Sequence, residues 1–314
     1  MTAPVAADTG LPPGTVTIVL STFNGAPFLP AQLDSFIAQT DVPWRLFWRD
    51  DGSSDDTVAV MQSFAAGPGA GRCHRVDHGG HLGVTPSYMA LLRAAVAQGA
   101  GVVAFSDQDD VWLPHKLSRS LGEIGADPAP ALYCSRQVLV DAALRPVCDS
   151  APVRVRPGFG PALTQNIATG CTVLLNRAAS TLVAGSVAPP ATLHDWWSYL
   201  VIAAAGGRIV ADDERTVLYR QHGSNAVGAP PSNLRRAIAA LSRGPGVFMV
   251  VFRSHVAALQ AQPDLLSPAS RRTLEVVASG LSGGLPAKLR ALAQGLRRQT
   301  RAETMLFRCW FLVG

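Results

Sequence analysis

Short apolar runs alternate with helical patterns over the first 125 residues, and this alternation is the strongest constraint on the fold of the chain. Buried strands are indicated by the branched or alternating apolar pattern of residues 16–20, 45–49, 72–76 and 101–105. The segments between them carry apolar residues at helical spacing, for example Leu29, Leu33, Phe36 and Ile37. Such an alternation predicts an α/β fold with a doubly wound, mainly parallel sheet flanked by helices, in which ligands bind beyond the carboxyl ends of the strands.

The rest of the chain divides into two further parts. Residues 126–228 mix short strand-like runs, including 208–211 and 216–220, with a helix that starts near Trp196. Helical patterns dominate from Pro231 onward. We therefore expect a leader over 1–14, an α/β domain over 15–228 and a basic helical extension over 229–314. The first half of the domain, 15–125, is expected to bind a nucleotide without a glycine-rich phosphate loop, because neither GxGxxG nor GxxxxGK[ST] occurs in it.

The composition excludes several classes of protein. Of the 314 residues, 48% are apolar and 16% are charged, so the chain buries enough surface to offset its conformational entropy. No window of about 18 residues is apolar throughout, as a membrane span requires. Residues 1–8 lack the basic and apolar regions of a signal peptide, which predicts a cytoplasmic protein. Five widely spaced cysteines fit neither a disulfide framework nor a zinc ribbon.

Positive charge is concentrated in the C-terminal extension. Residues 231–314 contain twelve lysines and arginines against three acidic residues, whereas the net charge of the whole chain is only +5. Leucines at helical spacing lie among these basic residues from Leu285 to Leu296. This pattern is typical of a helix on an anionic membrane surface, and equally of a helix that packs its apolar stripe on the α/β domain. Nucleic acid is not an expected partner, because aromatic residues are not interleaved with the arginines.

Two acidic turns follow predicted strands. Asp107 and Asp109 come directly after the strand at 101–105, and carboxylates this close repel each other unless a cation lies between them. Oxygen ligands of this kind suit Mg²⁺ or Mn²⁺, although an acidic turn that caps the next helix has the same pattern. Asp50 and Asp51 precede Gly52 in the other turn, where a carboxylate can accept hydrogen bonds from a pyrimidine or a ribose. A surface turn before a helix explains that second pattern almost as well.

Taken together in their order, eight short motifs resemble those of family 2 glycosyltransferases across roughly residues 16–228. They are TFNG at 22–25, QLDS at 32–35, DDGS at 50–53, LGV at 82–84, SDQDDVWLP at 106–114, TGC at 169–171, HDWW at 194–197 and YRQHGSN at 219–225. Within that family the sequence is most similar to bacterial transferases, often rhamnosyltransferases, that build surface polysaccharides. The resemblance implies a GT-A fold, a nucleotide-diphospho-sugar donor, a divalent metal ion and inversion at the anomeric carbon.

The resemblance also implies roles for individual residues in the donor site. Asp50 would contact the nucleobase with Asp51 beside it, and Thr22 would lie near the nucleoside. Asp107 would approach the ribose or the metal, and Asp109 would bind the metal between the two phosphates. His222 corresponds to a histidine that contacts the metal or the diphosphate in some relatives, with an ordinary loop histidine as the alternative.

Asp195 is the candidate general base. An inverting transfer needs a carboxylate that takes the proton from the attacking hydroxyl of a saccharide or lipid-linked acceptor, and residues 126–228 would form the acceptor half. An N-cap role for the helix near Trp196 is the alternative, and both roles are compatible. Two other functions remain open at this point: a nucleotidyltransferase or other nucleotide-sugar enzyme, and a non-catalytic sugar-binding subunit.

Overall fold

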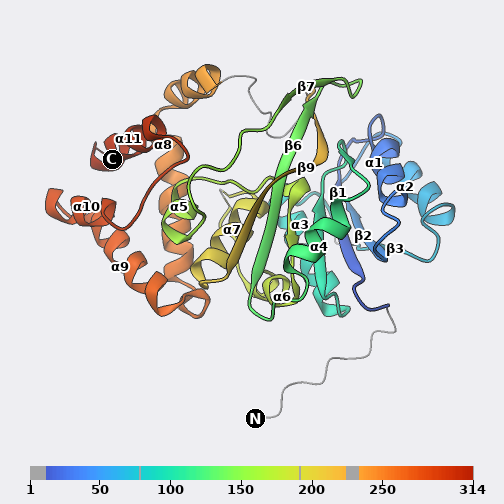
Figure 1. Cartoon of the computed structure of the whole chain (residues 1–314), viewed down its shortest axis with the longest axis horizontal. Helices are drawn as coiled ribbons and strands as arrows, with labels where there is room; N and C mark the ends of the chain where they lie inside the picture. Colours follow the sequence, from blue (N-terminus) through green and yellow to red (C-terminus); the bar gives the residue numbers. More distant parts are fainter. Residues whose placement is uncertain (1–11, 78, 191, 224–232, 314) are drawn as a thin grey trace, which may run out of the picture.

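The computed structural model describes residues 12–77, 79–190, 192–223 and 233–313, with the side chains of 233–245 and 247 left aside. Most of the expected leader therefore lies outside the described residues. Within the described part, a nine-stranded curled sheet runs through the molecule in the order β3-β2-β1-β4-β8-β6-β9-β5, with β7 paired to β6 (Figure 1). The expected α/β fold with a mostly parallel sheet is confirmed.

The first half of the sheet is the predicted parallel unit. Its strands are β1 (Val16–Thr22), β2 (Trp44–Asp50), β3 (Cys73–Arg75) and β4 (Val102–Ser106), and neighbouring members of this set are parallel. Residues 16–20 of β1 are almost fully buried because helices cover both faces. Ile18 and Leu20 belong to one core layer, and Val19 belongs to the other. A strand buried on both faces needs a continuous apolar run, which explains the pattern in the sequence.

Helices cover the two faces of the sheet. Val16, Ile18 and Leu20 share a core with α1 (Leu29–Ile37), α2 (Thr57–Ala66) and α4 (Lys116–Ile124). The opposite core layer contains side chains from α3 (Val84–Ala97), α6 (Arg177–Gly185) and α7 (His194–Ala204). This two-sided packing is the doubly wound arrangement that the alternation predicts.

The second half of the sheet mixes directions. It comprises β5 (Val111–Trp112), β6 (Ala131–Val140), β7 (Pro146–Asp149), β8 (Leu174–Leu175) and β9 (Arg208–Arg220). The long ladder between β6 and β9 is parallel, and the short ladders of β5, β7 and β8 are antiparallel. The prediction of two separate strands at 208–211 and 216–220 is wrong. A break in register at Ser135 and Arg136 of β6 accommodates the extra residues of β9 as a bulge, so the strand continues.

The C-terminal extension forms a helical layer against α7. It contains α8 (Asn233–Gln260), a 3₁₀ turn (Pro263–Leu265), α9 (Pro268–Ser282), α10 (Leu285–Leu292) and α11 (Arg301–Val313). Leu296, Phe307 and Phe311 are buried in the same core layer as α7. Hydrogen bonds join the extension to the domain: Thr164 Oγ1, at the end of α5 (Phe159–Thr164), donates to Arg297 O at 2.6 Å, and Ser267 N donates to Ala204 O at 2.9 Å. Among the described residues, no helix is both long and apolar enough to cross a membrane.

Candidate active site

The carboxyl ends of β1, β2 and β4 bring the two acidic turns to one edge of the sheet. Thr22 is paired with Asp50 in the β1–β2 ladder, and Leu20 is paired with Ser106 in the β1–β4 ladder. Gln108, in the loop after β4, connects this loop to the one after β1. Its side chain accepts from Phe23 N and donates to Phe23 O, both at 2.9 Å. Asn24 N, in the loop after β1, donates to Ser53 Oγ at 2.8 Å, so the loops after β1, β2 and β4 form one continuous rim.

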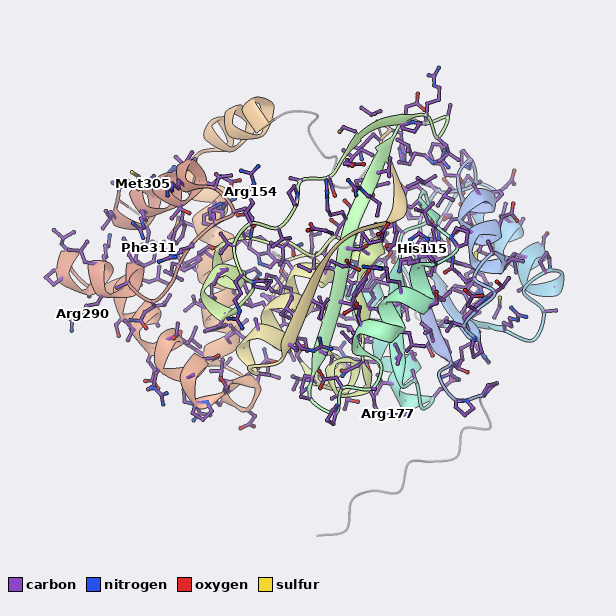
Figure 2. All side chains as sticks on the ribbon, viewed as in Figure 1. His115, Arg154, Arg177, Arg290, Met305 and Phe311 are labelled. Carbon is purple, nitrogen blue, oxygen red and sulfur yellow. The ribbon has the colours of Figure 1, made fainter. Side chains whose placement is uncertain are left out.

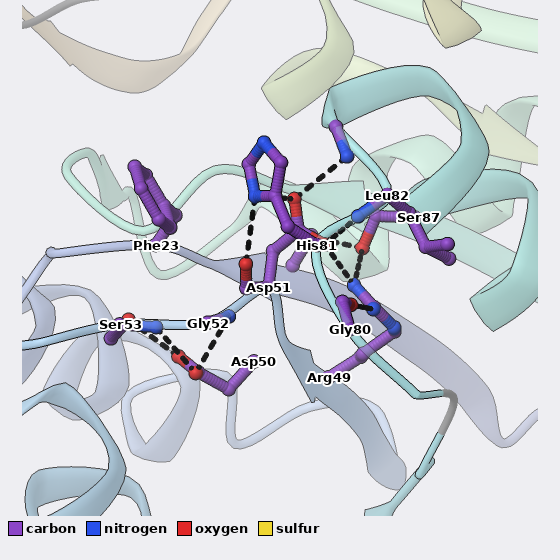
Figure 3. Close-up of polar contacts among 12 residues, drawn as sticks. Phe23, Arg49, Asp50, Asp51, Gly52, Ser53, Gly80, His81, Leu82 and Ser87 are labelled. Carbon is purple, nitrogen blue, oxygen red and sulfur yellow. Dashed lines mark hydrogen bonds and ion pairs between the residues drawn. The ribbon is translucent and has the colours of Figure 1, made fainter.

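Asp50 lies beside a cavity of about 310 Å³. One of its carboxylate oxygens accepts from Ser53 N at 2.8 Å and Gly52 N at 3.1 Å, and the other accepts from Ser53 Oγ at 2.6 Å and Thr22 Oγ1 at 3.0 Å (Figure 3). Gly52 has a φ of +97°, which explains glycine at this turn. The structure thus joins Thr22 and Asp50. The cavity is lined by Asp50, Gly52, Arg75, Val76, Asp77, Gly79 and Gly80.

Asp51 points in the other direction, into the protein. Its carboxylate forms an ion pair with Arg49 and accepts from Leu82 N at 2.7 Å and Gly83 N at 2.8 Å, at the start of α3 (Figure 3). Burial by itself would raise the pKa of Asp51, but the hydrogen bonds from Leu82 N and Arg49 outweigh it and lower that pKa. The side chain of Asp51 is only 5% exposed, so the geometry supports anchoring of the 80–83 loop.

The loop after β4 concentrates negative charge. Asp107 Oδ1 accepts from Tyr88 OH at 2.9 Å, and Asp110 is buried with Oδ1 accepting from Arg220 N at 3.0 Å. Burial raises the pKa of Asp107 to about 7, and the adjacent charge of Asp109 adds to the effect. Burial likewise raises the pKa of Asp110. Three buried or half-buried carboxyl groups so close together are unfavourable unless a cation or protons compensate them.

The end of β9 delivers His222 to this loop. His222 Nε2 lies 2.9 Å from Asp109 Oδ2, although 113 positions separate the two residues in the chain. The His222 ring also stacks on Phe28, with ring centroids 4.4 Å apart. Arg220 holds the end of β9 against the loop after β4, since its Nε donates to Asp109 O at 2.7 Å. The two residues expected to bind the metal are therefore neighbours.

Beside this pair, a separate cluster of described residues that does not include Asp109 or His222 could hold a cation. Ligand atoms of Asp107, Asp110 and Cys171 all lie within 4.8 Å of one another. Burial raises the pKa of the Cys171 thiol well above its usual value, so the oxygen atoms are the available anionic ligands. Carboxylates and an imidazole are acceptable ligands for Mn²⁺, and carboxylates for Mg²⁺.

Asp195 lies in the first turn of α7. The N-cap role is wrong, because the helix begins at His194 and Leu193 occupies the cap position. The carboxylate instead accepts from Gly170 N at 3.0 Å and from its own neighbour Trp196 N at 2.5 Å. Burial raises the pKa of Asp195 to about 6, against the effect of these hydrogen bonds.

Asp195 and the acidic loop share one site. The charge of Asp195 contributes to the raised pKa of Asp107. Cys171, beside the Gly170 that binds Asp195, lies against Asp107 and Asp110. Sequence reasoning missed Tyr88 and Arg220, which hold this arrangement together. Arg220 lies inside a motif that was recognised, whereas nothing in the local pattern distinguishes Tyr88 from an ordinary core residue of α3.

A mostly parallel curled sheet with helices on both faces and acidic loops at the carboxyl ends of its strands defines a doubly wound α/β class of fold. Residues 17–144 match the family model described as glycosyl transferase family 2. This segment of the chain is thus similar to the family 2 glycosyltransferases.

Relatives and solved structures agree with that assignment. The chain is 23% identical over 228 residues to the dTDP-rhamnosyl transferase RfbG of Shigella flexneri. This match covers 67% of this chain and 74% of RfbG. It is 23% identical over 124 residues to the glucosyltransferase WfgD of Escherichia coli, covering 40% and 46% of the two chains. The fold is similar to that of S. aureus TarS 1–349, with a TM-score of 0.57, 15% identity and coverage of 90% and 80%. It is also similar to the mannosyltransferase PcManGT from Pyrobaculum calidifontis, solved with GDP-Man and Mn²⁺, with a TM-score of 0.51, 17% identity and coverage of 99% and 91%. These likenesses establish the GT-A fold.

Proposed function

We propose that the protein is a metal-dependent inverting glycosyltransferase of surface polysaccharide synthesis. It would move a sugar from a nucleotide-diphospho-sugar donor to a hydroxyl of a saccharide or lipid-linked acceptor. The observation that carries this proposal is the gathering of Asp107, Asp109, His222 and Asp195 in one site, from three separate segments of the domain. A site of this composition contains both a cation-binding group and a carboxylate whose pKa suits a general base.

The donor side of the proposal uses the rim of the sheet. Asp50 borders the cavity for the nucleoside, Thr22 holds the Asp50 carboxylate by a hydrogen bond, and Asp51 keeps the adjoining loop in place. Asp107 would contact the ribose or the metal, while Asp109 and His222, which lie 2.9 Å apart, would hold Mg²⁺ or Mn²⁺. The metal would stabilise the negative charge that develops on the departing diphosphate.

Asp195 acts on the acceptor side. As the acceptor oxygen bonds to the anomeric carbon, the bond from that carbon to the phosphate oxygen breaks and the acceptor proton passes to the Asp195 carboxylate. A pKa of about 6 leaves most of this carboxylate ionised at neutral pH while keeping it more basic than an exposed aspartate. Attack from the side opposite the leaving group inverts the anomeric configuration.

A panel of nucleotide sugars tests the donor. In the presence of Mn²⁺ we expect one of dTDP-rhamnose, UDP-glucose, UDP-GlcNAc and GDP-mannose to raise the melting temperature, because a ligand at 100 times its Kd stabilises the folded state by about 2.7 kcal/mol. The similarity to a dTDP-rhamnosyl transferase over two thirds of the chain makes dTDP-rhamnose the first choice. Turnover should release a nucleoside diphosphate and stop with EDTA. Release of pyrophosphate would instead identify a nucleotidyltransferase, and binding without turnover a sugar-binding subunit.

The proposal includes contact with an anionic membrane surface on the cytoplasmic side. The inward side chains of α10 and α11 are buried, but Leu289 and Met305 are 53% and 56% exposed. Arg290 and Met305 lie at the end of the molecule formed by the C-terminal helices, far from the nucleotide-binding half (Figure 2). Exposed apolar side chains among basic residues are typical of a surface that docks on anionic lipid.

Liposome flotation tests this contact. We expect the full-length protein to float with vesicles that contain phosphatidylglycerol. We expect it not to float with neutral phosphatidylcholine vesicles. The double variant Leu289→Glu/Met305→Glu should lose most of its flotation, because each glutamate removes apolar contact and adds like charge. Val147→Glu is the matched control, since Val147 is 57% exposed on β7. Equal flotation of the double variant and the control would exclude the membrane contact.

A further inference from the structure

One buried histidine has no polar function in the described structure. His194 is 4% exposed, and neither of its ring nitrogens has a hydrogen-bond partner among the described residues. Burial lowers its pKa to about 3, so the ring is neutral. Buried polar atoms without partners are costly and are rare in folded proteins. Its position immediately before Asp195 suggests that the ring has a role in the site.

The His194 ring lies flat against Tyr88. The two ring centroids are 3.8 Å apart with an interplanar angle of 12°, and Phe105 packs edge-on against His194 at 4.9 Å. The ring also leaves no space at Gly170, where an added Cβ would lie 2.9 Å from Nε2. His194 therefore packs against both Tyr88 and the glycine whose N–H binds Asp195.

Tyr88 connects this stack to the acidic loop. Its hydroxyl lies 2.6 Å from Ser106 O and 2.9 Å from Asp107 Oδ1, and these two acceptors share its single proton. The stacked rings of Tyr88 and His194 therefore connect Asp107, on the donor side, to the helix turn that carries Asp195, on the acceptor side. Its members come from α3, β4 and α7, so no local sequence pattern reveals it.

We propose that Tyr88 and His194 are positioning residues, which set the placement of Asp107 and of Asp195 relative to each other. Tyr88 orients the Asp107 carboxylate, and His194 acts as a flat neutral spacer that fixes the first turn of α7. Active-site carboxylates must be held to a fraction of an ångström, and a partner that orients a metal ligand supports metal affinity. This inference rests on the proposed glycosyltransferase function.

The variant Tyr88→Phe tests the donor side of the stack. It keeps the ring and removes only the hydroxyl that bonds to Asp107. We expect the Kd for Mn²⁺ alone, measured by electron paramagnetic resonance on the full-length protein, to rise about tenfold. Tyr199→Phe is the matched control, because Tyr199 is also buried on α7 and its hydroxyl bonds to no carboxylate among the described residues; its Kd should equal that of the wild type.

The variant His194→Ala tests the acceptor side. We expect kcat to fall about 10²-fold because Asp195 loses its support, while donor Kd stays within a few-fold of the wild-type value. His255→Ala is the control: this histidine is also buried, packs against Trp196 and Trp197, and bonds to Thr192 instead. It should lower the melting temperature without changing kcat beyond a few-fold.

The outcomes separate this inference from the proposed function. If the wild type binds Mn²⁺ and transfers sugar but Tyr88→Phe and Tyr199→Phe behave alike, the positioning role is wrong and the function stands. If folded His194→Ala and His255→Ala reduce kcat equally, His194 is only a core residue. A wild type that neither binds Mn²⁺ nor transfers sugar would overturn the proposed function itself.

Discussion

Replacing Asp195 by asparagine should reduce kcat by roughly 10²- to 10⁴-fold, the usual contribution of a general base. Asparagine keeps the size of the side chain and an oxygen for Gly170 N, but it cannot take a proton from the acceptor hydroxyl. Donor binding depends on the rim around Asp50 and Asp109, so the donor Kd measured by calorimetry should stay within a few-fold of the wild-type value. Loss of turnover with donor affinity retained is the signature of an interaction made in the transition state.

The pH dependence of the wild type supplies the control for this result. Because burial raises the pKa of Asp195 to about 6, kcat at saturating metal should fall as the pH drops below about 6, where the carboxyl group becomes protonated. The residual activity of Asp195→Asn should lack that acidic limb. Asp264→Asn, at an exposed position outside the site, should keep both the rate and the limb. A kcat for Asp195→Asn within a few-fold of the wild type would exclude the base role.

Replacing Asp109 by asparagine should weaken Mn²⁺ binding and lower kcat by about 10²-fold or more. The physical reason is that a metal supplies several kcal/mol of stabilisation to the leaving group, and about 1.4 kcal/mol corresponds to a factor of ten. The melting temperature should not fall, because Asp109 is partly exposed and its negative charge repels the negative charge of Asp107. The measurements are Mn²⁺ titration of the activity and calorimetric binding of Mn²⁺.

Asp213→Asn is a matched control for the metal prediction. Asp213 is exposed on β9, the strand that leads to His222, and should leave both the metal dependence and kcat unchanged. EDTA should abolish wild-type activity, and added Mn²⁺ should restore it. Full activity of Asp109→Asn in EDTA would show that the transfer does not need a metal at this position.

The parallel half of the sheet was predictable because burial on two faces leaves a continuous apolar run in the sequence. The same rule located the acidic turns, since the ends of parallel strands coincide at one edge of the sheet. The family resemblance placed Thr22 and Asp50 near the same nucleoside, and the structure joins them by a hydrogen bond. The direction of Asp51 was not predictable, because it depends on Arg49 and on a loop 31 positions away.

The C-terminal helices illustrate a different limit. Leucine spacing predicted a helix around residue 290, but it did not decide which leucines pack inward. Leu292 and Leu296 are buried against the domain, whereas Leu285 and Leu289 face outward. The leucines cover more of the helix surface than one neighbouring face can bury. The packing of the neighbouring helices therefore determines which leucines are buried.

By itself the sequence determined the class of fold, the family resemblance and the types of chemical groups available, because periodicity and short motifs are local properties of the chain. Only the tertiary structure decided that His222 meets Asp109, that Asp195 binds Gly170 near Asp107, and that Tyr88 and His194 stack between them. The reason is physical: these contacts join residues up to 113 positions apart, and their geometry is set by how whole strands and helices pack.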